Sequence, residues 1–158
     1  MIYLDENEIT VKASKEAVIG EEYELNGQKY KVVDEEMLHE MVKNEEDVTK
    51  IVSTRVTDMS DLFYEKNKEF GDEGFDQDIS SWDVSKVVNM ASMFGGANDF
   101  SQDIGNWDVS NVLSMSSMFE GAHNFDEDIG NWDVGKVTDM RWMFSCARNF
   151  HGDLSRWD

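Results

Sequence analysis

The residues best placed to do chemistry are aspartates that return at one position of a 25-residue pattern. They are Asp78, Asp103, Asp128 and Asp153. Carboxylates stacked by such a repeat repel one another unless something compensates their charge. Calcium could bridge them, or each could accept hydrogen bonds from backbone N–H groups of its own turn. No repeat has the ligand spacing of an EF-hand loop, so we predict backbone capping and no cofactor, with calcium as the alternative.

The other reactive side chains show no catalytic arrangement. His39, His123 and His151 share no metal-ligand spacing, and the single cysteine, Cys146, takes the place of Gly96 and Gly121 in other repeats. No serine lies in a nucleophile-elbow context, and there is no phosphate-binding loop. The sequence therefore predicts a protein that is not an enzyme.

Tryptophan marks the repeat, because Trp82, Trp107, Trp132 and Trp157 are 25 residues apart. The pattern V-x-x-M-x-x-M-F-x-x-A-x-x-F-x-x-D-I-x-x-W-D-V-x-x runs in full over 87–111 and 112–136. A shorter copy covers 137–158, and the first copy, 56–86, has six extra residues between Phe63 and Phe75. Self-similarity at a fixed period predicts a stacked array of one structural unit.

Within one repeat the spacing of apolar residues changes. Val87, Met90, Met93, Phe94 and Ala97 are spaced as on a short helical or 3₁₀-like arc, and the run from Phe100 to Trp107 is typical of a short strand followed by a bend. One such unit cannot bury its own apolar edge. Stacked units can, because each residue then lies beside its equivalent in the next repeat.

Residues 1–55 are predicted to form a different, N-terminal unit ahead of the repeats at 56–158. Residues 8–13 alternate like a strand, and 23–33 read as a β-hairpin that turns at Asn26-Gly27. Asp34 is a suitable N-cap for a helix with one apolar face. We expect residues 34–55 to cover the first repeat, with Ile51 in the position of the repeat tryptophan.

The composition limits the partners. The 158 residues carry a net charge of −20, spread over both units. Such a chain repels nucleic acid and anionic lipid, so we expect no nucleic-acid binding, and cations or basic proteins suit it better. No stretch has the length of a membrane span, so no membrane insertion is expected. The first ten residues do not resemble a signal peptide.

The irregular positions are the candidate binding residues. Trp142 replaces the small or polar residues found in the other repeats, and three arginines lie near it; an exposed tryptophan beside arginine is typical of binding hot spots. The insertion after Phe63 is either a recognition loop or an ordinary surface loop. The last coil offers an apolar edge for a protein partner or for self-association, unless its final residues cover it. The candidates are Tyr64, Phe70, Arg141, Trp142, Arg148, Arg156 and Trp157.

The segments Val112-Leu-Ser-Met-Ser-Ser-Met-Phe119 and Phe125-Asp-Glu-Asp-Ile-Gly-Asn-Trp-Asp-Val134 resemble the repeat of BspA-like bacterial surface proteins. The resemblance covers residues 56–158. It implies an α+β fold: a right-handed solenoid, related to leucine-rich repeats, of about four coils with short strands and short helical arcs. It also implies surface or adhesion roles and no catalytic residues.

The function predicted from these observations is non-catalytic recognition of macromolecules, of the surface or adhesion type. A structural subunit of a larger assembly or virion is the alternative, and a calcium-stabilised binding module is a second. The localisation stays open: the resemblance implies the cell surface or secretion, while the lack of a signal peptide leaves the cytoplasm or a virion open.

Overall fold

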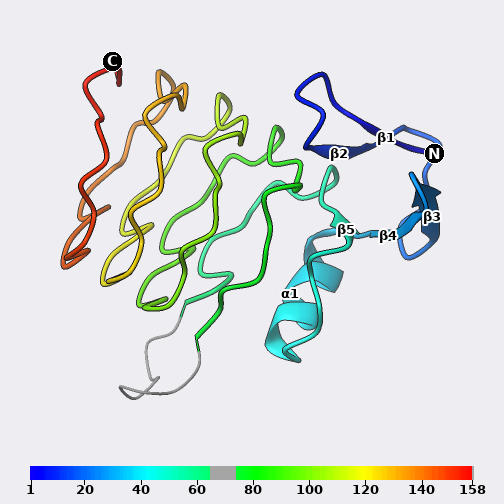
Figure 1. Ribbon diagram of the computed structural model, residues 1–158, viewed down its shortest axis with the longest axis horizontal. Coiled ribbons are helices and arrows are strands. Elements are labelled where there is room, and N and C mark those ends of the chain that lie inside the picture. The colour runs from blue at the N-terminus through cyan, green and yellow to red at the C-terminus, as the bar shows by residue number, and fades with distance from the viewer. Residues whose placement is uncertain (65–73, 158) are drawn as a thin grey trace.

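The computed structural model describes residues 1–64 and 74–157, with the N-terminal sheets at one end and the last repeat at the other (Figure 1). Its regular elements are β1 (Ile2–Leu4), β2 (Val11–Ala13), β3 (Glu22–Leu25), β4 (Gln28–Val32), α1 (Glu35–Lys43) and β5 (Ile51–Val52). Strands β1 and β2 form an antiparallel pair, and β4 lies between antiparallel β3 and parallel β5.

The predictions for the N-terminal unit are confirmed where local chemistry decides the structure. Asn26 and Gly27 have positive φ angles of 51° and 78°, as a tight hairpin turn between β3 and β4 requires. The side chain of Asp34 accepts a hydrogen bond from the N–H of Met37 at 3.0 Å and so caps α1. Helix α1 then buries Leu38 and Met41 against the repeats.

The predicted right-handed, leucine-rich-repeat-like solenoid with short strands and helical arcs is wrong. The described residues contain one helix of nine residues and five short strands, all between residues 2 and 52. The described residues of the repeats contain neither a helix nor a strand, and consist of turns joined by irregular segments and isolated bridges. The leucine-rich-repeat description fails for the same reason.

Backbone geometry explains why the predicted arc is not helical. In the second repeat the N–H of Met93 bonds to the carbonyl of Met90, and the N–H of Gly95 bonds to that of Ser92. Ser92 and Gly96 have positive φ angles of 54° and 72°. A residue in the left-handed region ends any right-handed run, so the helix-like spacing of apolar residues comes from separate turns.

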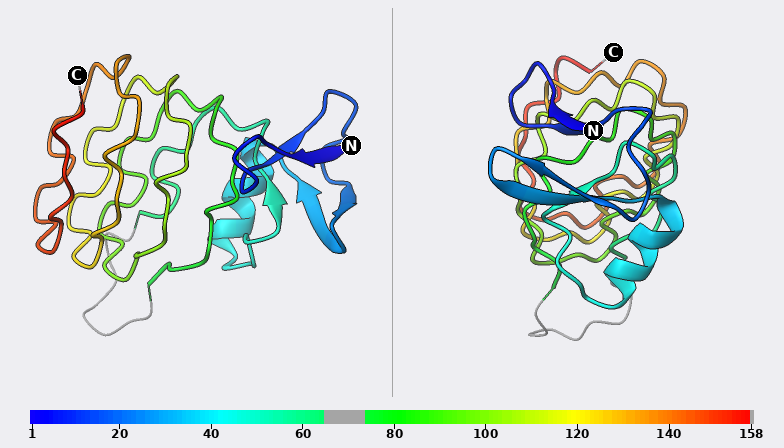
Figure 2. Two further views of the ribbon diagram at one scale, coloured as in Figure 1. Left: turned by 45° about the horizontal axis from the view of Figure 1, so that its top comes forward. Right: turned by 90° about the vertical axis from the view of Figure 1, so that its right-hand side faces the viewer.

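The repeats lie side by side and are joined through their backbones (Figure 2). Isolated parallel bridges connect Asp58 to Asn89, Asn89 to Ser114, and Ser114 to Asp139. On alternate residues next to these bridges, N–H groups of one repeat donate to carbonyls of the following repeat. The contacts between repeats are thus short β-like pairings set between turns.

The core consists of columns of equivalent side chains. Phe94, Phe119 and Phe144 stack with ring centroids 5.5 and 5.7 Å apart. The indole N–H of Trp107 donates to the carbonyl of Ile79 in the preceding repeat, and the other repeat tryptophans do the same one repeat apart. Trp82 donates in this way to Val48. Residues 48–52 therefore continue the repeat geometry, with Ile51 in the tryptophan position.

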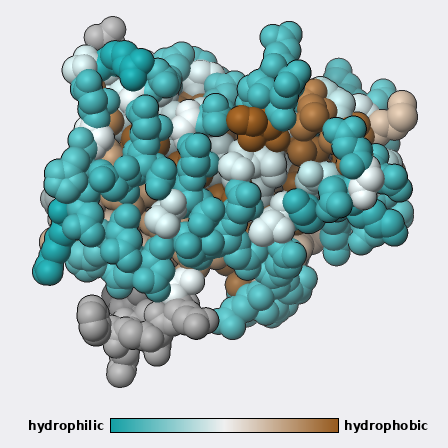
Figure 3. All heavy atoms as spheres, viewed as in Figure 1, coloured by the Kyte–Doolittle hydropathy of each residue, from teal (hydrophilic) through white to brown (hydrophobic). Residues whose placement is uncertain are grey.

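The visible face of the repeats is mostly hydrophilic, while hydrophobic residues gather near the N-terminal sheets (Figure 3). A separate small cluster there includes Ile2, Val11, Val32 and Val52. No helix in the described part of the chain is long and apolar enough to cross a bilayer.

Candidate functional site: the outer face of the fourth repeat

The fourth repeat, residues 137–157, has a side turned away from the third repeat, and this side is called the outer face below. In the third repeat Met115, Phe119, Phe125, Ile129 and Trp132 are at most 3% exposed. Their equivalents in the fourth repeat are only partly buried: Met140, Phe144, Phe150, Leu154 and Trp157. The outer face therefore presents the apolar columns that every earlier repeat buries beneath its successor.

A row of backbone donors crosses the outer face. In the third repeat the N–H groups of Met115, Ser117, Phe119 and Gly121 donate to carbonyls of the fourth repeat at 2.7–2.9 Å. The equivalent N–H groups belong to Met140, Trp142, Phe144 and Cys146, and within the described residues they have no acceptor. The carbonyls of Met140, Trp142 and Phe144 already accept bonds within their own turns. The outer face therefore carries a row of donors without acceptors among the described residues, together with the carbonyl of Thr138, whose equivalent, the carbonyl of Leu113, accepts a bond from the following repeat.

Trp142 is the most exposed large hydrophobic residue in the described part of the repeats, at 70%. Its φ angle is 59°, and the equivalent residues Asp61, Ser92 and Ser117 share this left-handed conformation. A large side chain gains nothing from exposure and adds cost in this conformation. Trp142 therefore differs from its equivalents in size and apolar character but not in backbone conformation.

The three arginines each end a column of equivalent side chains. The columns are Ala91, Ser116 and Arg141; Asn98, His123 and Arg148; and Asn106, Asn131 and Arg156. The members of a column can touch: Arg156 donates to Asn131 at 2.6 Å, and the ring of His123 contacts Asn98. The next residue in each column would therefore lie beside an arginine.

The arginines differ in how far their charge is neutralised. The guanidinium of Arg141 donates two hydrogen bonds to the carboxylate of Asp139. Together with the backbone N–H of Arg141, they hold the pKa of the Asp139 carboxyl at about 2. Arg156 bonds only to a neutral amide, and Arg148 has no ion-pair or hydrogen-bond partner among the described residues. Arg148 and Arg156 are thus the cations most available to a ligand.

The electrostatic contrast with the other repeats is clear from the sequence. The second repeat has no Lys or Arg and three aspartates, and the third has one lysine against five acids, giving net charges of −3 and −4. The 137–158 repeat has three arginines against three aspartates, so its net charge is zero. In a chain of net charge −20, the fourth repeat therefore repels an acidic group less than the second and third repeats do.

The remaining candidate residues lie elsewhere. Tyr64 packs over Gly95 at the junction of the first two repeats, where a Cβ on Gly95 would meet the Tyr64 ring at 2.7 Å. It therefore does not join Trp142 in one site. Phe70 lies outside the described residues. Trp157 lies on the outer face with the arginines.

The recurring aspartates bond to their own turns. Asp78, Asp103, Asp128 and Asp153 each accept a hydrogen bond from the N–H two residues further on, at 2.9–3.0 Å. These bonds, with the hydroxyls of Ser80 and Ser155, lower the pKa of Asp78 and Asp153. The prediction of backbone capping is confirmed. No group of three or more metal-ligating side chains within 1–64 and 74–157 is arranged to hold a metal.

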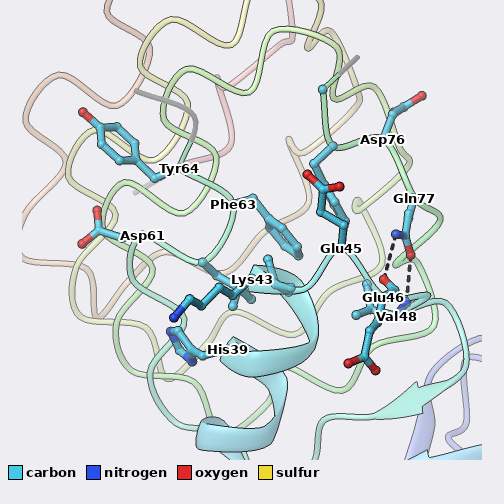
Figure 4. A pocket seen from close by; sticks show the side chains of 14 residues that line it. His39, Lys43, Glu45, Glu46, Val48, Asp61, Phe63, Tyr64, Asp76 and Gln77 are labelled. Carbon is cyan, nitrogen blue, oxygen red and sulfur yellow. Dashed lines mark hydrogen bonds between the residues drawn. The ribbon is translucent and has the colours of Figure 1, made fainter. Parts of the chain in front are cut away.

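A hollow of about 630 Å³ lies between α1 and the first repeat (Figure 4). Gln77 closes one side by bonding to the backbone of Glu46 and Val48, and Phe63 lines the interior. His39 and Lys43 lie at its rim with several acids, but no group there is paired as a nucleophile and base.

The sequence indicated the tryptophan and the arginines of this face but not its row of N–H donors. That row depends on which backbone groups are already paired, which side-chain types do not reveal. The change from small or uncharged residues to arginine along the three columns was visible in the sequence and could have pointed to this face.

The described chain thus consists of two small sheets and one helix, followed by stacked repeats built from turns. It belongs to the family described as Mycoplasma protein of unknown function, DUF285, whose model matches residues 34–157. The match takes in α1, β5 and all four repeats, and leaves β1 to β4 outside. No curated protein and no solved structure matches the chain.

Proposed function

We propose that this protein is a non-catalytic recognition module of the surface or adhesion type that binds another protein through the outer face of its fourth repeat. One observation carries the proposal: this face repeats the surface of the third repeat that the fourth repeat covers, and its row of N–H donors has no acceptor among the described residues. Such an edge is a template for an added strand-like segment.

The side chains on the outer face support binding rather than catalysis. Trp142 is exposed beside Arg141, a composition common at the centres of protein interfaces. Phe144, Phe150 and Trp157 supply partly exposed apolar area around it. No pairing of a nucleophile with a base occurs among them, and Cys146 is a free, exposed thiol.

The same geometry argues against the alternative of a symmetric assembly through this face. Two copies of the outer face placed together would set N–H donors against N–H donors. Donors of the row that stay unpaired would lose their water, which costs about 1–3 kcal/mol for each buried group. The natural occupant is a segment that supplies carbonyls.

The proposal is tested with a 25-residue peptide that has the sequence of residues 112–136, because this sequence forms a repeat in the native stack. Titration into the ¹⁵N-labelled 158-residue chain should shift the amide signals of Met140, Trp142, Phe144 and Cys146. Trp142→Ser should weaken binding by about ten-fold, as loss of a hot-spot side chain does.

Val88→Ser provides the matched control, since Val88 is 42% exposed but belongs to the second repeat. It should leave peptide binding unchanged. Absence of any shift at millimolar peptide, or shifts confined to the hollow beside α1, would overturn the proposal.

A further inference from the structure

We propose that residues 1–17 fill, within this chain, a site that binds an extended segment of another protein, one with an apolar residue followed by lysine or arginine. Residues 1–17, which contain β1 and β2, are called the arm below. The surface under the arm, called the floor, is formed by Val52, Thr54, Arg55, Ser81 and Asp83. The inference adds a second site to the recognition function proposed above and does not depend on the outer face.

Backbone contacts attach the arm to the floor. In Figure 1, β2 lies between β1 and the first repeats. The N–H of Val11 donates to the carbonyl of Ser81 at 2.9 Å, and the N–H of Ala13 donates to the hydroxyl of Thr54 at 3.0 Å. Both donors are main-chain groups on alternate residues of β2. An extended segment of another protein offers the same groups at the same spacing.

Arg55 holds the chain directly after β2. Its guanidinium donates to the carbonyls of Ser14 and Lys15 at 2.9 and 3.2 Å. These acceptors also belong to the main chain, so Arg55 fixes the position of a bound segment without selecting its side chains. The floor therefore has acceptors for one part of an extended segment and a donor for the part that follows.

The side chains of β2 define what the floor selects. Val11 is 1% exposed and packs with Val52 in the small cluster near the N-terminal sheets. Partial burial lowers the pKa of Lys12, but the hydrogen bond that Lys12 donates to Asp5 and the negative charge of Asp83 outweigh this effect and raise it. A segment that replaces β2 therefore needs an apolar residue followed by a cation.

The floor does not require the arm for its own hydrogen bonds. The carboxylate of Asp83 accepts bonds from the hydroxyls of Thr54 and Ser85 at 2.7 and 2.6 Å. Asp108, the equivalent of Asp83 in the second repeat, accepts the same bond from the N–H two residues further on, yet Asp108 is exposed and Asp83 is buried. The arm thus buries Asp83 without being needed for its turn, so the repeats can keep this surface uncovered.

The arm is attached so that it can leave as a unit. Strands β1 and β2 form a sheet of their own, and the buried apolar residues of the arm belong to the small cluster rather than to the core of the repeats. An isolated two-stranded sheet is marginally stable, so the arm depends on docking for its structure. Residues 18–21, which connect it to β3, are exposed. Release of the arm therefore needs only a local change.

Amide exchange of the unaltered chain tests whether the arm opens. The N–H groups of Val11 and Ala13 should exchange at least about 100-fold faster than the N–H of Met90, which is bonded between central repeats. Protection of Val11 and Ala13 equal to that of Met90 would mean that the arm leaves only on global unfolding. This result overturns the inference.

Binding is measured with a peptide that has the sequence of residues 8–16. The host is the 158-residue chain with Ala13→Pro, which removes the N–H that bonds to Thr54 and leaves the floor unchanged. Titration should shift the amide signals of Thr54 and Arg55. The peptide should bind at least about ten-fold more tightly than to the unaltered chain, where the arm competes. Tyr3→Ser, on an exposed part of β1, should behave like the unaltered chain.

A second peptide tests the requirement for a cation. With Lys12→Glu in the peptide, binding to the Ala13→Pro chain should weaken at least about ten-fold, because the new carboxylate meets Asp83. Adding Asp83→Asn to that chain should bring the two peptides close to equal affinity. Adding Asp108→Asn instead, the equivalent change one repeat away, should leave the difference intact. Equal binding of the two peptides by the Ala13→Pro chain overturns the requirement for a cation.

The remaining outcomes also decide the matter. Absence of any shift in the Ala13→Pro chain at millimolar peptide overturns the site. A doubling of mass when the unaltered chain is concentrated, with Val11 and Ala13 becoming more protected, would show that copies exchange arms and overturns the assignment to another protein. The peptide of residues 112–136 should bind the unaltered and Ala13→Pro chains equally, so failure at the floor is distinguishable from failure at the outer face.

Discussion

The third and fourth repeats share one sequence pattern and one set of turns, yet they differ in burial. Phe119 and Phe125 are fully buried in the third repeat, while Phe144 and Phe150 in the fourth are half-buried. Ser117 and Trp142 have φ angles of 54° and 59°, so the backbone is the same. The difference in burial comes from the adjacent repeat. The fourth repeat covers the apolar side chains of the third, whereas no described residues cover those of the fourth.

This comparison separates residues that stabilise the stack from residues that are available to a partner. In the third repeat, the residue at each column position packs against or hydrogen-bonds with its equivalents in the adjacent repeats. In the fourth repeat the same positions carry Trp142, Arg148 and Arg156. Substitutions at equivalent positions of the two repeats should therefore have opposite effects on stability and on binding.

The largest contrast is expected for the tryptophans. Trp107 is 3% exposed and stacks on Trp132, so Trp107→Ala should lower the free energy of unfolding by about 3–5 kcal/mol. Trp157→Ala removes a half-buried ring and should cost roughly half as much. Chemical denaturation followed by circular dichroism measures both. Equal losses would show that the fourth repeat is as well covered as the second.

Amide exchange should show the same contrast without mutation. The N–H groups of Met115, Ser117, Phe119 and Gly121 are bonded across repeats and should exchange at least about 100-fold more slowly than those of Met140, Trp142, Phe144 and Cys146. Hydrogen–deuterium exchange followed by NMR measures the rates. Comparable protection in the two rows would mean that the outer face is already occupied.

A smaller effect is expected from the residues with positive φ. Cys146 has a φ angle of 59°, where the equivalent Gly96 and Gly121 have 72°. Cys146→Gly and Trp142→Gly should each raise the free energy of unfolding by up to about 1 kcal/mol, because glycine adopts this conformation without strain. The two variants should differ in function, since only Trp142→Gly should weaken peptide binding.

Thermal denaturation of these variants provides the measurement. A loss of stability in Trp142→Gly would show that the exposed ring supports the fold, which would remove the argument that it was selected for binding. Gly121→Ala in the third repeat is the reverse control and should be destabilising, since it places a Cβ at a φ angle of 72°.

The smallest effect concerns the ion pair of the fourth repeat. Arg141→Gln should raise the pKa of Asp139 from about 2 toward the ordinary value of 3.8. Because the pKa is lowered in the folded chain, the pair stabilises the fold above the ordinary pKa, and this contribution is lost as the pH falls toward 2. NMR titration of the Asp139 carboxyl measures the shift, and Asp153, held by the N–H and hydroxyl of Ser155, should not move.

Short-range chemistry was readable from the sequence. Asn26-Gly27 specifies a hairpin turn, Asp34 caps a helix, and the aspartates of the repeats accept from amides two residues away, because each feature involves residues close in the chain. The 25-residue period likewise fixed which side chains become equivalent, and thereby the columns of phenylalanine and tryptophan.

The secondary structure of the repeats was not readable in this way. The spacing of Met90, Met93 and Phe94 suits a helical face, but left-handed residues at Ser92 and Gly96 divide the segment into separate turns. Serine gives no clear sign of positive φ, and the pairing of N–H groups with the next repeat makes this geometry favourable.

The sequence by itself therefore determined the period, the local caps and turns, and the excess of negative charge. Only the tertiary structure decided which surfaces are covered, because burial depends on the neighbour of each repeat and not on the repeat itself. It also showed that the backbone donors of Met140, Trp142 and Phe144 lie in one row without acceptors in the described part of the chain, since the pairing of a backbone group depends on distant residues rather than on its own side chain.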